Sequence, residues 1–336
     1  MAKQIIAPAH QRFNKHLNVL SDHLIASRKA DHASLALYKS GARTPLFMLE
    51  SLARIHRSIH NKKLFSKLYE DFKKPEDLLG GIDHYEVLHK EYSKNKNIPK
   101  EVLTYFEEGR GNSVKSLNKM LKKEKWISKK QKKIIKISDK LENADWLTTN
   151  EELPAIATFL IQEIEYIKKS LETGRLSFRD IETGVHELRR KLRWLSIYPA
   201  SLNGSIQLTP QKTVPASFKK YITPKIVNSP FNTFSNSKRG LKTIKINANN
   251  FYALSWIIAE LGEIKDKGLK VHAITEALEH KGILEGERAI KKAMEISGQK
   301  GVTVKTLLSQ AESITHDFVF KHHVLDKLEN DIARFV

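Results

Sequence analysis

A helical period runs through most of the sequence and limits the folds open to the chain. Apolar side chains recur about every 3.6 residues, and few segments alternate as a half-buried strand does. We expect breaks at Pro75, at the Gly80-Gly81 pair and at a turn over residues 109–113. The pattern therefore predicts an all-α fold, with helices over residues 9–40, 45–70, 114–141, 154–174, 180–198 and, with turns near Gly262, Gly282, Gly298 and Gly301, 251–335.

Residues 199–250 interrupt this pattern. Proline, serine, asparagine, threonine and glycine dominate there, and short alternations at 205–208 and 243–246 predict two paired strands. We expect a long basic, partly β insertion, and loops of that length are usually functional or disordered. The 336 residues have room for two domains. We place them at 1–150 and 151–336, each a helical-bundle half, with the insertion in the second.

The composition excludes several classes of protein. The chain has no cysteine, so disulfides, thiolate metal sites and a cysteine nucleophile are excluded. No apolar run reaches the ~20 residues of a membrane-spanning helix. The N-terminal residues 1–8 contain only a short apolar patch, unlike a signal peptide. We therefore expect a cytoplasmic protein that does not act at a membrane.

No arrangement of residues indicates catalysis. A nucleophile elbow, a P-loop, a dinucleotide-binding glycine loop, an HExxH motif and an EF-hand loop are all absent from the sequence. The pairs His56/His60 and His322/His323 lack a third ligand at helical spacing, so we assign no metal. We expect no cofactor and no enzymatic activity. A phosphoester- or polyphosphate-processing enzyme would need clustered carboxylates for Mg²⁺, and only residues 141–187 offer them.

Positive charge is unevenly distributed. The chain carries 58 Lys and Arg against 38 Asp and Glu, a net charge of +20. Residues 110–140 hold twelve basic and two acidic residues, residues 141–187 reverse the sign, and residues 188–259 contain no Asp or Glu. Net charge alone keeps a protein in solution, but it does not require clustering, whereas clustered cations attract polyanions. We therefore favour a polyanion as the partner.

A stripe of lysines follows residues 114–141. Steps of three and four place its members on one face of a single helix, about 37 Å long at 1.5 Å per residue: Lys115, Lys119, Lys122, Trp126, Lys129, Lys133, Lys136 and Lys140. Such a face is either a solvated surface or a track for a phosphate backbone. We take Lys122, Lys129 and Lys133 as candidate ligands of the polyanion.

A second basic face is expected on the helix over residues 180–198. His186, Arg189, Arg190 and Arg193 sit at i, i+3, i+4 and i+7 and share one side of that helix. Such groups repel one another unless an anion or a nearby carboxylate relieves them. Guanidinium forks match phosphate oxygens, and an imidazole can donate from either ring nitrogen. We interpret the face as an anion site; the alternative is a surface that pairs with the acidic segment 141–187.

The segment His186–Arg193 resembles the signature helix of the CHAD family (conserved histidine α-helical domain). In that family a histidine is followed three and seven residues later by basic residues. Its helical domains have a two-fold internal repeat, and each half carries a Leu-Gly turn closely followed by Asp. Leu261-Gly262 with Asp266 is similar to that turn.

The first half resembles the same pattern at two places. Leu79-Gly80 is followed by Asp83, one residue early. Upstream, Lys39 and Arg43 fall where two basic residues of the signature helix would lie, with Ala36 in place of the histidine. The resemblance implies two bundle halves related by a repeat, and Lys39 and Arg43 as further ligands.

What the resemblance implies for function is non-catalytic binding of inorganic polyphosphate by basic residues on facing helices. The alternative is an RNA- or single-stranded-DNA-binding protein that uses the same cations. Such proteins stack bases on aromatic side chains beside a basic groove. The aromatic residues near the basic segments are Trp126, Trp194, Phe218, Tyr221, Phe231 and Phe234. The sequence does not indicate the oligomeric state.

Overall fold

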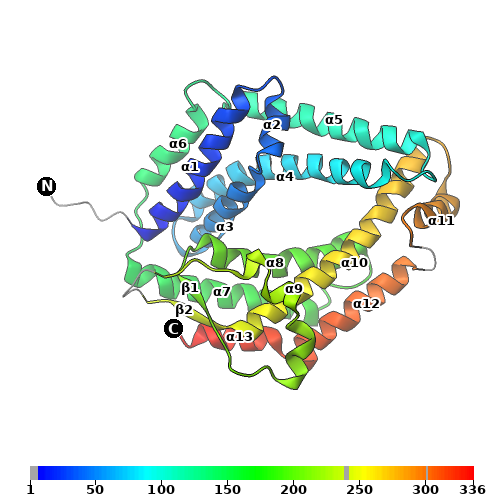
Figure 1. Cartoon of the computed structure of the whole chain (residues 1–336). Coiled ribbons are helices and arrows are strands. Elements are labelled where there is room, and N and C mark those ends of the chain that lie inside the picture. The colour runs from blue at the N-terminus through cyan, green and yellow to red at the C-terminus, as the bar shows by residue number, and fades with distance from the viewer. Residues whose placement is uncertain (1–6, 238–241, 300–301) are drawn as a thin grey trace. The chain divides into compact units, whose positions relative to one another are not determined.

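The computed structural model describes residues 7–237, 242–299 and 302–336, and most of them are helical (Figure 1). This confirms the predicted all-α class. The chain divides into two compact units, Met1–Glu152 and Leu153–Val336. The N-terminal segment considered above lies almost wholly outside the described residues, and so does the turn expected at Gly301.

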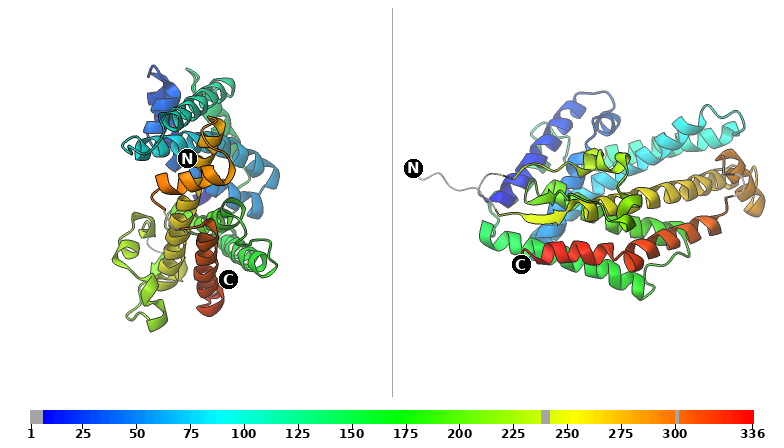
Figure 2. Two further views of the ribbon diagram at one scale, coloured as in Figure 1. Left: turned by 90° about the vertical axis from the view of Figure 1, so that its right-hand side faces the viewer. Right: turned by 60° about the horizontal axis from the view of Figure 1, so that its bottom comes forward.

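In the described part of the first unit, all regular secondary structure is helical. The loop after α4 returns the chain, so that α4 and α5 pack side by side (Figures 1 and 2). Its core contains fully buried aromatic side chains, among them Phe13, Phe65, Phe72 and Phe106. Its helices are α1 (Pro8–Arg28), α2 (Ala33–Lys39), α3 (Arg43–Ile59), α4 (Lys62–Tyr92), α5 (Lys100–Lys123), α6 (Lys132–Glu142) and the first residues of α7 (Thr149–Glu172).

The second unit packs around one long helix, α10, which contacts α8, α11, α12 and α13 (Figures 1 and 2). Beyond the rest of α7, its elements are η1 (Ile181–His186), α8 (Glu187–Ser201), β1 (Ile206–Thr209), η2 (Ala216–Tyr221), α9 (Pro224–Val227), η3 (Pro230–Asn232), β2 (Ile244–Asn247), α10 (Ala248–His280), α11 (Gly286–Ile296), α12 (Val304–His316), η4 (Asp317–Lys321) and α13 (Val324–Ala333).

Residues 199–250 contain the two short strands that the sequence predicts. β1 and β2 pair in parallel, from Ile206 opposite Ile244 to Thr209 opposite Asn247. A parallel pair requires a crossover connection, and the segment carrying η2, α9 and η3 supplies it. The isoleucines of the pair are buried, and η2 and α9 pack against α10. The described part of residues 199–250 is thus folded onto the second unit.

Several glycines expected to end helices lie inside them, which corrects the predicted breaks. Gly80-Gly81 is within α4, residues 109–113 are within α5, and Gly262 is within α10. Three of these glycines allow a close approach: a Cβ atom on Gly80 or on Gly262 would lie 2.9 Å from an arginine side chain, and one on Gly109 would lie 2.5 Å from the Tyr85 side chain. Glycine in a helix costs about 1 kcal/mol relative to alanine, and this packing offsets that cost.

Two other expected glycine turns are present. Gly282 follows α10 with φ +64°, and Gly298 follows α11 with φ +70°. After each glycine, the next backbone N–H reaches back to a carbonyl in the last turn of the helix, from Ile283 to Leu278 and from Gln299 to Met294. This left-handed ending is the commonest use of glycine at a helix C-terminus.

Prolines are also accommodated inside helices. Pro75 lies within α4, and α7 begins at Thr149, before Pro154. Pro199 does not end α8, which continues to Ser201. A proline removes one backbone donor and crowds the preceding turn, and isolated examples are tolerated when the packing of the helix holds it together.

The single helix predicted over residues 114–141 is wrong, because the chain turns back between α5 and α6. Lys125 adopts a left-handed conformation (φ +65°), and the Trp126 N–H donates to the Leu121 carbonyl at 2.9 Å. This is the hydrogen-bond pattern of a Schellman ending, formed here without glycine. The Trp126 side chain is 1% exposed. The sequence pattern places Trp126 on the exposed lysine face, but the burial of its side chain draws it into the core.

Within the described ranges, no helix has both the length and the apolar character required to cross a lipid bilayer.

Gly184 in η1 provides a test of the packing that precedes α8. A Cβ atom at this position would lie 2.1 Å from the Ser177 carbonyl oxygen, which is backbone and cannot rotate away. We expect Gly184→Ala to lower the free energy of unfolding by roughly 2 kcal/mol or more. Gly111→Ala is the matched control, because nothing lies within 4 Å of its Cβ position. That substitution should be neutral or stabilising by up to about 1 kcal/mol. Equal thermal unfolding midpoints for the two variants would contradict the packing.

Candidate functional site

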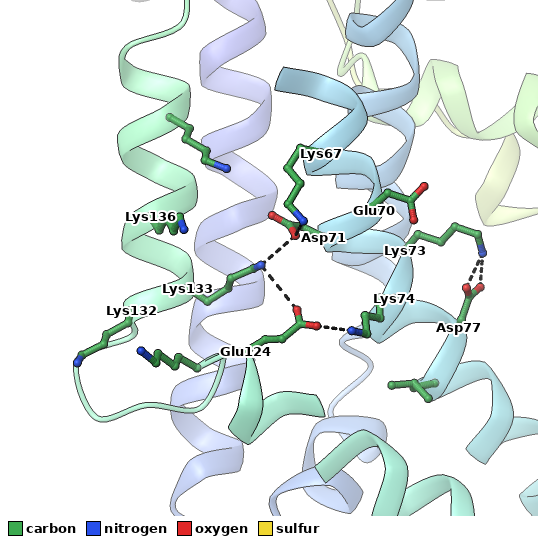
Figure 3. Close-up of a pocket in the computed structure, with 13 residues that line it drawn as sticks. Lys67, Glu70, Asp71, Lys73, Lys74, Asp77, Glu124, Lys132, Lys133 and Lys136 are labelled. Carbon is green, nitrogen blue, oxygen red and sulfur yellow. Dashed lines mark hydrogen bonds and ion pairs between the residues drawn. The ribbon is translucent and has the colours of Figure 1, made fainter. Parts of the chain in front are cut away.

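Lysine side chains of the first unit surround a cavity of about 940 Å³ (Figure 3). The cavity is formed by α4, by the turn after α5 and by α6. Eight lysines and four carboxylates line it, a net charge of +4. The lysines are Lys67, Lys73, Lys74, Lys125, Lys132, Lys133, Lys136 and Lys140, and the carboxylates are Glu70, Asp71, Asp77 and Glu124.

The amphipathic pattern of α6 explains why its lysines face this cavity. Ile134, Ile137 and Leu141 are buried and follow one another at steps of three and four. Lysine occupies four of the eight remaining positions of the helix, so burial of the apolar stripe directs these cations to the other side. The turn at Lys125 then brings α6 back toward α4. The stripe lysines of α6, which are Lys133, Lys136 and Lys140, therefore line one side of the cavity.

Part of the positive charge in the cavity is already paired. The Lys133 ammonium lies 2.9 Å from Asp71 Oδ1 and 3.7 Å from Glu124 Oε2. The other oxygen of Glu124 accepts a hydrogen bond from Lys74, so this carboxylate joins the α4 and α6 walls (Figure 3). Lys67 pairs with Asp71 at 3.4 Å, and Lys73 pairs with Asp77.

Four other lysines of the cavity are not paired in this way. Within the part of the chain that the structure describes, no salt bridge to a carboxylate is formed by Lys125, Lys132, Lys136 or Lys140. All four come from the α5–α6 turn or from α6. Like charges held close together repel one another, and an anion relieves that repulsion. An anion bound on this side of the cavity would therefore relieve the most repulsion among the lysines.

The Glu124 carboxylate is held in its charged form. Burial by itself raises the pKa of Glu124, but the hydrogen bond from Lys74 and the positive charges of Lys74 and Lys133 outweigh it, and the net result is a lowered pKa. Glu124 therefore remains an anion at neutral pH. The cavity contains a fixed negative charge among its lysines.

The structure places the three candidate lysines of the stripe differently. Lys133 lines the cavity, whereas Lys122 and Lys129 are exposed and are not part of its lining. The α4 wall was missed by the sequence reasoning. Its signal was present, because Lys67, Asp71 and Lys74 are spaced at four and three residues and share one face of a helix.

The basic face on α8 has carboxylate partners within its own unit. His186 Nδ1 lies 3.0 Å from both Glu182 oxygens, and Arg190 Nη2 lies 2.6 Å from Glu187 Oε2. These carboxylates belong to the acidic segment that the sequence offered as the alternative partner. The structure gives no test of the polyphosphate-binding role of His186, Arg189, Arg190 and Arg193, which remains a prediction.

Arg189 differs from its neighbours because it is largely buried. Its Nε donates to the Ile258 carbonyl at 3.1 Å, and the side chain packs over Gly262 of α10. Burial lowers the pKa of Arg189, and the nearby Asp266 opposes that shift. Arg189 therefore joins α8 to α10.

Arg43 has the corresponding contacts in the first unit. Its guanidinium packs over Gly80 of α4 and forms ion pairs with Glu76 at 2.8 Å and with Asp83 at 3.0 Å. Tyr38 also donates to Asp83, at 3.0 Å. Lys39, the other basic residue proposed by resemblance, is exposed at the end of α2.

Most of the aromatic side chains near the basic segments are not available to stack with bases. Phe234 is half-buried and packs edge to face on Phe251, with ring centroids 4.9 Å apart. Phe231 is 80% exposed. The remaining members of the set are 8% exposed or less: Trp126, Trp194, Phe218 and Tyr221.

The two histidine pairs lie in different surroundings. Burial, with smaller contributions from Arg12 and His60, lowers the pKa of His56 to about 3, so its imidazole is neutral. His322 forms a hydrogen bond with the Tyr221 hydroxyl at 2.6 Å. Among the described residues, no group of three or more His, Asp or Glu side chains is arranged to hold a metal ion.

No protein-family model, no curated protein and no solved structure matches the chain.

Glu50, on α3, makes stability depend on pH. It is 3% exposed, and burial together with the negative charge of Glu76 raises its pKa from 4.5 to about 7. Between about pH 4.5 and 7 the unfolded chain releases this proton and the folded chain retains it. The contribution of Glu50 to the free energy of unfolding is therefore largest at acid pH. It decreases by on the order of 3 kcal/mol as the pH rises to 7.

Glu50→Gln should remove this dependence. Relative to the wild type, the variant should gain stability progressively from pH 5 to pH 8, as measured by chemical denaturation at each pH. A difference in unfolding free energy that stays constant across this range would contradict the assignment.

Proposed function

We propose that this protein binds inorganic polyphosphate without catalysis. The observation that carries the proposal is the cavity in which eight lysines outnumber four carboxylates, with four of those lysines forming no salt bridge among the described residues. Lysine is a point charge with rotatable donors, suited to an anion that has charge along its whole length. A polyphosphate chain engages many such cations at once.

A long, flexible anion fits this lining better than a single phosphate group. The cations come from three segments, and they surround an open volume rather than one tight subsite. Binding of a linear polyanion releases condensed counterions, so the affinity gains with each phosphate neutralised and falls steeply with salt. A lone phosphate gains little from this effect.

The aromatic residues favour polyphosphate over nucleic acid. Proteins that bind single strands combine a basic groove with aromatic side chains on which bases stack. Four of the six aromatic residues near the basic segments are buried, and Phe234 packs against Phe251. A ligand without bases requires no such platform.

Binding without chemistry agrees with the arrangement of the carboxylates. Three of the four cavity carboxylates, Asp71, Asp77 and Glu124, form ion pairs with its lysines. A phosphoryl-transfer or hydrolytic site would gather carboxylates to hold Mg²⁺ beside the reacting phosphate.

The repeated arginine contact supports the proposed kinship with CHAD domains and their internal repeat. In both units an arginine packs over the glycine of a Leu-Gly dipeptide, with an Asp three or four residues later beside it: Arg43 with Gly80 and Asp83, and Arg189 with Gly262 and Asp266. By this contact Arg43 corresponds to Arg189 rather than to Arg193, one helical turn from the register that the sequence suggested. Residues 199–250 then form an insertion between the α8 and α10 counterparts.

We also propose that the end of η1 and α8 contribute a second basic surface through His186, Arg190 and Arg193, with Lys39 as its counterpart in the first unit, where Arg43 takes the place of the largely buried Arg189. On α8, an anion would replace the local carboxylates Glu182 and Glu187 as the partner of these groups. This surface is therefore secondary to the cavity, where four lysines form no salt bridge with any carboxylate that the structure describes.

Three lysines of α6 provide the test. The variant Lys132→Gln/Lys136→Gln/Lys140→Gln should bind long-chain polyphosphate about 10- to 100-fold more weakly than the wild type. The slope of log affinity against log salt should fall by about 3, one for each lost contact. Calorimetric titration across a salt series measures both quantities.

The matched control carries the same loss of charge away from the cavity. Lys90, Lys94 and Lys100 are exposed near the far end of α4 and the start of α5, and their change to Gln should weaken binding by about threefold or less. Equal losses for the two triple variants would contradict the cavity as the site.

If RNA displaces polyphosphate at equal phosphate concentration, the ligand is nucleic acid. Arg190→Gln/Arg193→Gln tests α8: a fall in affinity includes that helix in the binding surface, and an unchanged affinity excludes it.

A further inference from the structure

We propose that Glu124 competes with the ligand for Lys74 and Lys133, and that it thereby sets how many linked phosphates an anion must carry to occupy the cavity. The inference rests on the proposed function and concerns the specificity of that same site.

The position of Glu124 is the first observation. It follows the last residue of α5, at the point where the chain turns back toward α6. One carboxylate oxygen accepts from Lys74 on α4, and the other lies 3.7 Å from the Lys133 ammonium on α6. Figure 3 shows the Glu124 carboxylate between these two cations. It therefore occupies the place where a bound phosphate would contact both walls.

Of the two carboxylates beside Lys133, Glu124 is the one that an anion can replace. Asp71 is the closer partner, at 2.9 Å from the ammonium, and its side chain is only 7% exposed. Glu124 is farther from Lys133 and its side chain is 21% exposed. Lys133 itself is 13% exposed, whereas Lys74 is 55% exposed. A ligand phosphate reaches Lys74 from solvent and meets Glu124 there, while Asp71 continues to hold Lys133.

The consequence is a threshold of ligand charge. An anion first meets the lysines of α6 and of the turn that have no salt bridge among the described residues. It is then repelled by the charged Glu124 carboxylate as it moves toward α4. A short anion has too few phosphates to offset this repulsion with other contacts. A long chain spreads its binding energy over many cations and over counterion release, so one carboxylate changes its affinity little.

The variant Glu124→Gln isolates this effect, because it removes the charge and keeps the size of the side chain. Calorimetric titrations would compare orthophosphate, tripolyphosphate and long-chain polyphosphate with the wild type and with the variant, at one moderate salt concentration. We expect the affinity for tripolyphosphate to rise about tenfold and that for the long chain about two- to threefold. The preference for long chains should therefore fall.

Asp139→Asn is the matched control for the loss of one negative charge. Asp139 is an exposed residue of α6 that does not line the cavity. This variant should raise both affinities by the same small factor and leave the length preference unchanged.

Lys74→Gln provides an independent measurement that does not depend on the folding of the Glu124 variant. It removes the more exposed partner of Glu124, so it should weaken the binding of long chains. When combined with Glu124→Gln, it should remove most of the gain for tripolyphosphate.

The outcomes separate the two proposals. If the wild type binds long-chain polyphosphate, and Glu124→Gln leaves the ratio of the two affinities unchanged or matches Asp139→Asn, the competition by Glu124 is excluded and the proposed function stands. If the wild type binds no polyphosphate near physiological salt, the proposed function itself fails.

Discussion

The burial of Trp126 is the interaction on which the lysine cavity depends. A helix continuing through this residue would leave a large indole on a lysine face, in water. The chain instead ends α5 with Lys125 in a left-handed conformation and places the Trp126 side chain in the core. Burying an aromatic side chain of this size is worth roughly 2–3 kcal/mol, enough to outweigh the left-handed conformation of a lysine. Because the chain turns here, α6 packs back on the first unit and its lysines face those of α4.

The overall class of the fold could be predicted from the sequence, because burial of an apolar stripe on each helix imposes a period that is visible without coordinates. The ends of the helices were harder to predict. Glycine ends α10 and α11 as expected, but Gly80 and Gly262 lie inside helices because an arginine packs against each of them. The conformational preference of glycine is a local property, whereas the close approach depends on a residue far away in the chain. Sequence reasoning weighs the first and has no access to the second.

The candidate site was predicted in part, and for a related reason. The density of lysine over residues 110–140 indicated a basic segment, and Lys133 of that segment lines the cavity. The spacing alone placed these lysines on one straight helix, so the wall supplied by α4 and the turn at Glu124 were missed. On α8, spacing identified a basic face, but it did not show that Glu182 and Glu187 pair with His186 and Arg190. The packing of the helices determines which cations have carboxylate partners. The two basic surfaces differ in this respect.

The charge of the cavity also accounts for its internal ion pairs. Eight lysines gathered without carboxylates would repel one another strongly enough to oppose folding. Asp71, Asp77 and Glu124 relieve this repulsion near α4, while Lys132, Lys136 and Lys140 of α6 form no salt bridge with a described carboxylate. The arrangement limits repulsion in the unliganded protein and still leaves the cations that the proposed anion would contact.

The most direct test of the central claim is the protection of individual lysines from acetylation by a bound anion. The rate of modification of each lysine would be measured by mass spectrometry, with and without long-chain polyphosphate. The account predicts strong protection of Lys136 and Lys140, with Lys90, Lys94 and Lys100 modified at unchanged rates. Protection that is uniform over all exposed lysines, or absent from α6, would contradict it.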